Sequence, residues 1–279
     1  MGVQVQHVFK SFAHNGSAID VLHDINLTVE DGEFVCLLGP SGCGKSTIVN
    51  LIAGLDRPDQ GQVLVDDKPV HGPDPSRTVV FQDPALFPWL TVLGNVEFGL
   101  RMAGLSRDQR REKAMTYIKL VHLSKFAAAF PHQLSGGMRQ RVAIARALTM
   151  KPNILLMDEP FGALDAQTRS ILQEEVLEAW QRTRTTLLFV THNVREATGL
   201  ADRVYEISSR PGHIKRVYKI DVPRPRMAAD PSLLAIQRRI LDSLGEEIAK
   251  VMQDELGEAI HIPETTGALA PDRSLGMHI

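Results

Sequence analysis

The segment from Gly39 to Thr47 carries residue types that bind a phosphate chain. It fits the pattern G-x-x-x-x-G-K-S/T, and it lies between the apolar run 34–38 and a stretch with apolar residues at helical spacing. In such a loop the backbone N–H groups converge on phosphate oxygens, the helix N-terminus adds a favourable dipole, and the lysine meets the β- and γ-phosphates. The pattern therefore predicts a nucleotide site. Its predicted contacts are Gly39, Pro40, Ser41, Gly42, Cys43, Gly44, Lys45, Ser46 and Thr47.

Two acidic residues, Asp158 and Glu159, follow the apolar run 154–157. If that run is a buried strand of the same sheet, its carboxyl end brings both acids beside the phosphates. We expect Asp158 and the Ser46 hydroxyl to hold Mg²⁺, and Glu159 to act as the general base toward an attacking water. Taken alone, such a pair is usually an ordinary loop start; the neighbouring P-loop favours the catalytic interpretation.

A second anion-binding helix start is predicted at Ser135, Gly136 and Gly137. A helical pattern follows them, so Ser135 is a candidate N-cap and the two glycines leave backbone N–H groups exposed. A plain N-cap without a ligand is the alternative.

These three motifs together resemble the ATP-binding subunit of an ABC transporter, over about residues 3–225. In that family two subunits face each other head to tail, and each ATP lies between the P-loop of one and the Ser-Gly-Gly element of the other. The resemblance implies that Ser135, Gly136 and Gly137 contact the nucleotide held by a second copy of the chain. Met138 stands where the family often has glutamine, a change we expect to be tolerated because backbone N–H groups do the binding.

The resemblance also assigns roles to four further residues. Gln82 would contact Mg²⁺ and the attacking water, and His192 would form a hydrogen bond to the γ-phosphate. Together with Lys45 and Glu159 they make up the expected catalytic set. Asp165 belongs to a loop that crosses the dimer interface. Phe12 stands where the family stacks an aromatic ring on adenine, with a core phenylalanine as the alternative.

The elements that position these residues alternate between strand and helix patterns. We predict an α/β fold, a P-loop NTPase of ABC type, with a mixed central sheet, an antiparallel β subdomain and an α-helical subdomain at about 88–150. The ATP-binding domain is expected to span 1–225. Residues 226–279 are expected to form a helical C-terminal appendage, with an amphipathic helix at 231–256 and a frayed tail.

Composition excludes several other classes. With 43% apolar and 23% charged residues the chain has a globular composition, and 31 Lys and Arg against 33 Asp and Glu leave no basic excess for nucleic acid. The apolar runs are too short for a membrane span. Cys36 and Cys43 fit a reducing compartment rather than a disulfide or zinc site. The basic run 107–113 is expected to be a solvated helix face.

The segment 81–96, Arg210–Gly212 and 223–226 are similar to subunits of bacterial importers of nitrate, sulfonates and taurine. This resemblance implies a peripheral ATPase on the cytoplasmic face of the inner (plasma) membrane that works with a separate permease and, indirectly, an extracytoplasmic substrate-binding protein. The alternatives are the ATPase of another ABC importer or of an exporter, a soluble ABC-type ATPase, and an unrelated P-loop kinase or switch. The permease is expected to dock on an apolar groove formed by Phe87, Pro88, Trp89 and Leu90, residues that could instead fill the local core.

Overall fold

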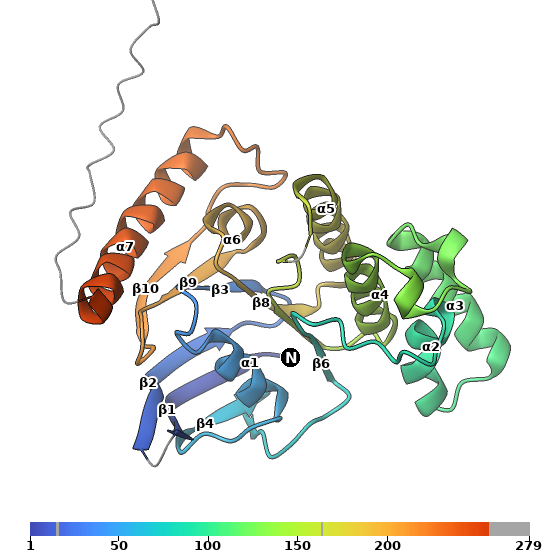
Figure 1. Cartoon of the computed structure of the whole chain (residues 1–279), viewed down its shortest axis with the longest axis horizontal. Coiled ribbons are helices and arrows are strands. Elements are labelled where there is room, and N and C mark those ends of the chain that lie inside the picture. The colour runs from blue at the N-terminus through green and yellow to red at the C-terminus, as the bar shows by residue number, and fades with distance from the viewer. Residues whose placement is uncertain (15–16, 163, 257–279) are drawn as a thin grey trace, which may run out of the picture.

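The computed structural model describes residues 1–14, 17–162 and 164–256, and it contains two sheets, a group of helices at one end and a long C-terminal helix (Figure 1). The strands are β1 (Val3–His14), β2 (Ser17–Val29), β3 (Phe34–Leu38), β4 (Gln60–Val65), β5 (Lys68–Pro69), β6 (Arg77–Val80), β7 (Ile154–Asp158), β8 (Thr186–Thr191), β9 (Arg203–Ile207) and β10 (Ile214–Lys219). The helices are α1 (Lys45–Ala53), α2 (Val92–Met102), α3 (Arg107–Leu120), α4 (Gly136–Thr149), α5 (Ala166–Thr183), α6 (Val194–Leu200) and α7 (Pro231–Leu256), with short 3-10 helices at Ser124–Phe126 and Pro131–Gln133.

The two sheets confirm the predicted fold class. The smaller sheet has the order β2-β1-β4-β5, and its strand pairs are antiparallel. The larger sheet has the order β10-β9-β3-β8-β7-β6 and is mixed, because β10 runs antiparallel to β9 while the other neighbouring strands are parallel. An α/β fold with a mixed central sheet and an antiparallel sheet is what the sequence predicts.

Residue pattern explains why the central strands lie where they do. Every residue of β3, β7 and β8 is buried, as expected for parallel strands covered on both faces, whereas β2 buries alternate residues toward its end. The parallel register pairs Leu38 with Thr191 and Asp158 with Val190. The carboxyl ends of β3, β7 and β8 therefore meet at one edge of the sheet, and the loops that follow them are brought together.

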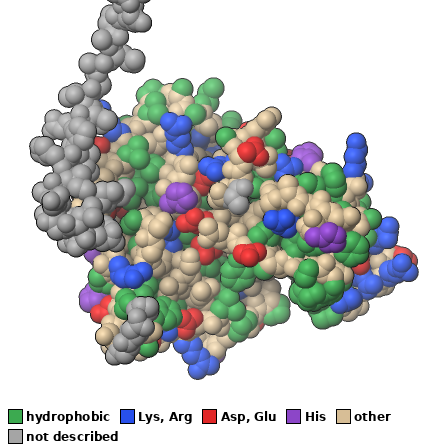
Figure 2. All heavy atoms as spheres, in the orientation of Figure 1, with side chains coloured by type: hydrophobic (Ala, Val, Ile, Leu, Met, Phe, Trp, Pro, Cys, Tyr) green, Lys and Arg blue, Asp and Glu red, His purple; other side chains and the backbone are tan. Residues whose placement is uncertain are grey.

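The helices α2, α3 and α4 pack around a small apolar core of their own that includes Val96, Ile118 and Val142. Lys and Arg side chains gather over this end of the molecule in Figure 2. The basic residues of the run 107–113 on α3 are exposed except for Arg110, which is half-buried. Arg110 Nε lies 3.4 Å from a carboxylate oxygen of Glu97. The run is therefore a solvated helix face, as predicted.

Helix α7 covers the predicted residues 231–256 and lies beside β10 and α6 (Figure 1). Leu233, Ile240 and Leu244 are buried in the main core, which explains the amphipathic pattern. The tail expected to fray, 257–279, lies outside the described residues. None of the helices described is long and apolar enough to cross a bilayer.

Candidate nucleotide-binding site

The glycine-rich loop after β3 adopts the conformation that its glycines permit. Gly42 and Gly44 have φ values of +77° and +96°, and a Cβ on Gly44 would lie 2.5 Å from Leu22 Cδ2. Lys45 begins α1, is buried, and donates from Nζ to the carbonyl oxygens of Gly39 (2.9 Å) and Pro40 (2.7 Å). The loop is thus folded around the lysine amine at the N-terminus of a helix.

A cavity of about 440 Å³ opens on this loop. It brings together Phe12, six of the nine predicted P-loop contacts, and Gln82 and Glu159 of the predicted catalytic set. The cavity is lined by Phe12, Val21, Ser41, Gly42, Gly44, Lys45, Ser46, Thr47, Gln82, Glu159 and Arg210. Phe12 is 43% exposed, so the alternative that it is a core phenylalanine is wrong.

Glu159 and His192 form a pair at the edge of this cavity. His192 Nδ1 lies 3.1 Å from Glu159 Oε2, and both side chains line a smaller adjoining recess. The amide of Glu159 donates to the Val190 carbonyl at 3.1 Å, and its φ is +43°. A left-handed conformation costs a non-glycine residue roughly 1 kcal/mol or more, and such residues concentrate at functional sites. The geometry therefore fixes one carboxylate between the cavity and the histidine.

Asp158, the last residue of β7, presents a carboxylate that is almost completely buried. Among the interactions of the described residues, its Oδ1 has no hydrogen-bond partner. Burial raises the pKa of Asp158 above its usual value, a hydrogen bond from the Ser46 side chain opposes the rise, and the nearby Glu159 carboxylate adds to it. An orphaned carboxylate oxygen beside a serine hydroxyl is a donor set that fits Mg²⁺.

The Ser135 element lies apart from the cavity. Ser135 caps α4, its Oγ accepting the Met138 amide at 3.3 Å, and Asp165 likewise caps α5 by accepting the Thr168 amide at 2.9 Å. The described residues that line the P-loop cavity do not include Ser135, Gly136, Gly137 or Asp165. Within one chain the two predicted phosphate-binding helix starts are therefore not brought to one cavity.

The segment proposed to contact a permease is held by a buried asparagine. Asn95 accepts the Phe87 amide at 2.8 Å and donates to the carbonyls of Phe87 and Leu90, both at 3.1 Å. The Phe87 ring packs 4.4 Å from the Phe98 ring, and Trp89 remains 70% exposed. The local scaffold thus fixes one large aromatic side chain on the surface.

Sequence reasoning missed Arg210 as a site residue. In the sequence Arg210–Gly212 is a turn signal and part of the resemblance to importer subunits, with no site role assigned. In the structure the Arg210 guanidinium lines the cavity and donates to the Gly42 carbonyl from Nη2 (3.2 Å) and Nε (3.4 Å). A basic residue in a turn after a predicted strand is the only signal available in the sequence, and it does not reveal which loop that turn approaches.

The fold and the cavity define a P-loop ATPase, with a lysine-bearing loop after one strand and an acidic pair at the end of another. The chain belongs to the ABC transporter family, whose model matches residues 22–162. It is 48% identical over 223 residues to the nitrate import ATP-binding protein NrtD of Synechocystis, covering 80% of this chain and 84% of that protein. It is also 42% identical over 241 residues to the aliphatic sulfonates import ATP-binding protein SsuB of Bacillus cereus, covering 86% and 95%.

Among solved structures, the chain resembles a dimeric post-hydrolysis state of the ATP-binding cassette MJ0796 bound to ADP and Pi. That match has a TM-score of 0.72 and 35% identity, and it covers 79% of this chain and all of the other. The chain is thus an ATP-binding, ATP-hydrolysing member of its family.

Proposed function

We propose that the chain is the ATP-hydrolysing subunit of an ABC importer that drives uptake of nitrate, a sulfonate such as taurine, or a related small anion through a separate permease. The observation that carries this proposal is the separation of Ser135 and its glycines from the P-loop cavity of their own chain. A helix start that is suited to an anion and does not line the P-loop cavity of its own chain is available to a nucleotide held by a second copy. The similarity to a nitrate import and an aliphatic sulfonates import ATP-binding protein favours an importer of small anions.

In this proposal ATP lies between two copies, bound by the P-loop of one and the Ser135–Gly137 helix start of the other. Lys45 neutralises phosphate charge, Phe12 stacks on the adenine, and His192 bonds the γ-phosphate. Glu159 accepts a proton from the attacking water. Asp165 belongs to the interface between the copies.

Ser46, Gln82 and Asp158 are the residues that would hold Mg²⁺. The unpartnered Asp158 Oδ1 supports this assignment, because a cation would stabilise the buried carboxylate. When bound, the ion supplies positive charge to the phosphate oxygens.

Hydrolysis removes the γ-phosphate contacts that hold the copies together, and their separation can move an attached membrane protein. The surface at Phe87–Leu90 is the proposed docking point, because its exposed Trp89 follows closely on Gln82 in the chain. The chain would then act at the cytoplasmic face of the plasma membrane.

The test is reconstitution of the chain with its co-encoded permease and binding protein in vesicles containing MgATP. We expect labelled nitrate or a labelled sulfonate to enter with the wild-type subunit and not with Lys45→Ala. Substrate leaving in the opposite direction would indicate an exporter. ATP hydrolysis without any dependence on the permease would indicate a soluble ATPase.

A further inference from the structure

The turn between β9 and β10, residues 208–213, lies against the P-loop and the neighbouring strand β2. Gly212 donates to the Val21 carbonyl at 2.8 Å and accepts from the His23 amide at 2.9 Å. A Cβ on Gly212 would lie 2.1 Å from the Cys43 carbonyl oxygen, so only glycine allows this approach. The turn therefore touches both β2 and the P-loop.

Arg210 stands at the apex of this turn and reaches the middle of the P-loop. Its two hydrogen bonds to the Gly42 carbonyl place the guanidinium on the wall of the nucleotide cavity, where it is exposed to the space that Lys45 also lines. A guanidinium has five N–H donors and a permanent positive charge. Those not used by Gly42 are available to phosphate oxygens.

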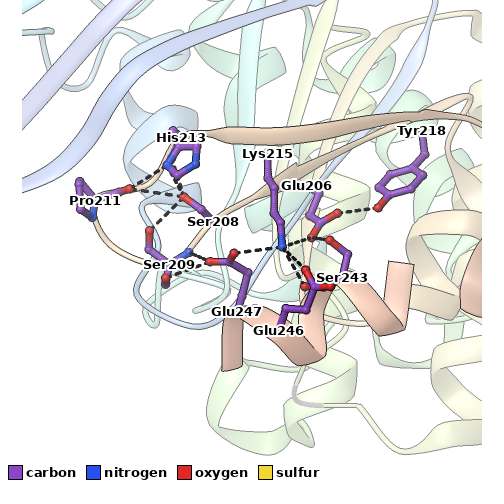
Figure 3. Close-up of polar contacts among 10 residues, drawn as sticks. All are labelled: Glu206, Ser208, Ser209, Pro211, His213, Lys215, Tyr218, Ser243, Glu246 and Glu247. Carbon is purple, nitrogen blue, oxygen red and sulfur yellow. Dashed lines mark hydrogen bonds and ion pairs between the residues drawn. The ribbon is translucent and has the colours of Figure 1, made fainter. Parts of the chain in front are cut away.

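Helix α7 anchors the residue next to Arg210 (Figure 3). The buried Glu247 accepts the backbone amide of Ser209 at 3.1 Å and the Ser209 hydroxyl at 3.0 Å. Its other oxygen lies 3.0 Å from Lys215 Nζ. Burial alone would raise the pKa of Glu247, but hydrogen bonds from Ser209 and Lys215 lower it to about 2, so the carboxylate is charged at neutral pH.

A second buried carboxylate extends the attachment along the same helix. Glu206 in β9 accepts from the Ser243 hydroxyl at 2.6 Å and the Tyr218 hydroxyl at 2.7 Å (Figure 3). Lys215 also donates to the Ser243 carbonyl at 3.1 Å. Buried polar groups whose hydrogen bonds are all satisfied favour a single arrangement of the elements that carry them. This network therefore holds α7 in a fixed position relative to the turn after β9.

We infer that Arg210 is a phosphate-contacting residue of the nucleotide site and that α7, through Glu247 and Ser209, positions it. Arg210 lies outside the 22–162 segment that matches the family model. The inference rests on the proposed nucleotide site and adds to it a second positively charged side chain besides Lys45, supplied from the C-terminal part of the chain. Arg210 is the binding residue, and Glu247 is a positioning residue that acts through it.

The test measures the affinity of the full chain for ATP with Mg²⁺ by calorimetry. We expect Arg210→Ala to weaken binding about tenfold, the usual scale for a charge-assisted hydrogen bond at an accessible site, and Arg210→Lys to recover part of the loss. Arg238→Ala, which removes the same charge from an exposed position on α7, should bind as wild type.

Glu247→Ala should weaken ATP binding severalfold in the wild-type background and have no further effect when Arg210 is already alanine, because it acts through that residue. The matched control is Glu246→Ala, which removes a neighbouring carboxylate that contacts Lys215 and leaves the Ser209 hydrogen bonds in place. Thermal unfolding of each variant separates a loss of affinity from a loss of fold, and Glu247→Gln, which keeps an acceptor oxygen for Ser209, should recover binding where the alanine variant is unstable.

Two results would overturn the inference while leaving the nucleotide site intact. In the first, Lys45→Ala abolishes binding and Arg210→Ala binds ATP as wild type. In the second, the effects of the Arg210 and Glu247 variants simply add. Normal ATP binding by Lys45→Ala would instead reject the nucleotide site itself.

Discussion

Replacing Glu159 with glutamine tests the proposed chemistry with little change in shape. Glutamine keeps a polar side chain within reach of His192, whose Nδ1 lies 3.1 Å from the Glu159 carboxylate. The positive φ of +43° at position 159 costs glutamate and glutamine a similar free energy. The variant therefore loses the proton acceptor and the negative charge, and we expect its unfolding free energy to stay within about 0.5 kcal/mol of wild type.

The expected effect on turnover follows from the role assigned to the carboxylate. A positioned general base contributes roughly 10²–10⁴-fold to the rate, so kcat should fall at least about a hundredfold, equivalent to about 3 kcal/mol of activation free energy. ATP affinity should stay the same or increase slightly, because the lost charge repels phosphate. Slow hydrolysis should in turn accumulate the ATP-bound dimer.

The assay combines phosphate release with size-exclusion chromatography and light scattering in MgATP. Glu112→Gln, an exposed carboxylate on α3, is the matched control and should hydrolyse ATP as wild type. If Glu159→Gln retained more than about a tenth of wild-type kcat, the general-base assignment would be wrong. If it bound ATP and eluted only as a monomer, the two-copy site would be wrong.

Three further expectations concern other parts of the molecule. Gly44→Ala should cost about 1–2 kcal/mol of stability and weaken ATP binding, since φ is +96° and the Cβ would meet Leu22; unchanged melting and affinity would refute the close-contact argument. Changing Trp89 and Leu90 to serine should reduce co-purification with the permease while ATP affinity stays constant, and full recovery of the complex would reject the docking surface. The pKa of Glu247 falls from 4.5 to about 2 on folding, so its charged carboxylate stabilises the protein fully above about pH 4.5 and less as the pH falls. Between pH 6 and 3.5 the free energy of unfolding, measured in urea, should fall by about 1 kcal/mol more for wild type than for Glu247→Gln, and equal falls would contradict the assigned pKa.

Local sequence patterns predicted the parts of the site that depend on local structure. The P-loop and the acids after β7 were found because a buried parallel strand is a continuous apolar run and the loop after it lies at a known edge of the sheet. The helix 231–256 was found in the same way from its apolar period. Burial of Leu233, Ile240 and Leu244 bears out that pattern.

What the sequence did not reveal depends on contacts between distant segments. Arg210 meets Gly42 across 168 residues, because β9 pairs with β3 and brings the following turn to the P-loop. Ser209 and Glu247 are separated by 38 residues, and no local pattern pairs them; the contact arises because α7 packs beside the β9–β10 hairpin. A buried polar residue is recognisable only from its partners, and no periodicity in one chain identifies those partners.

The most direct measurement of the central claim is a structure of the Glu159→Gln variant with ATP and Mg²⁺. The account predicts two copies enclosing two nucleotides, with the Ser135 helix start of each directed at the terminal phosphate bound by the other's P-loop. Nucleotide bound to the P-loop of a single copy, with Ser135 facing away from any phosphate and ATP turnover unaffected by its mutation, would contradict it.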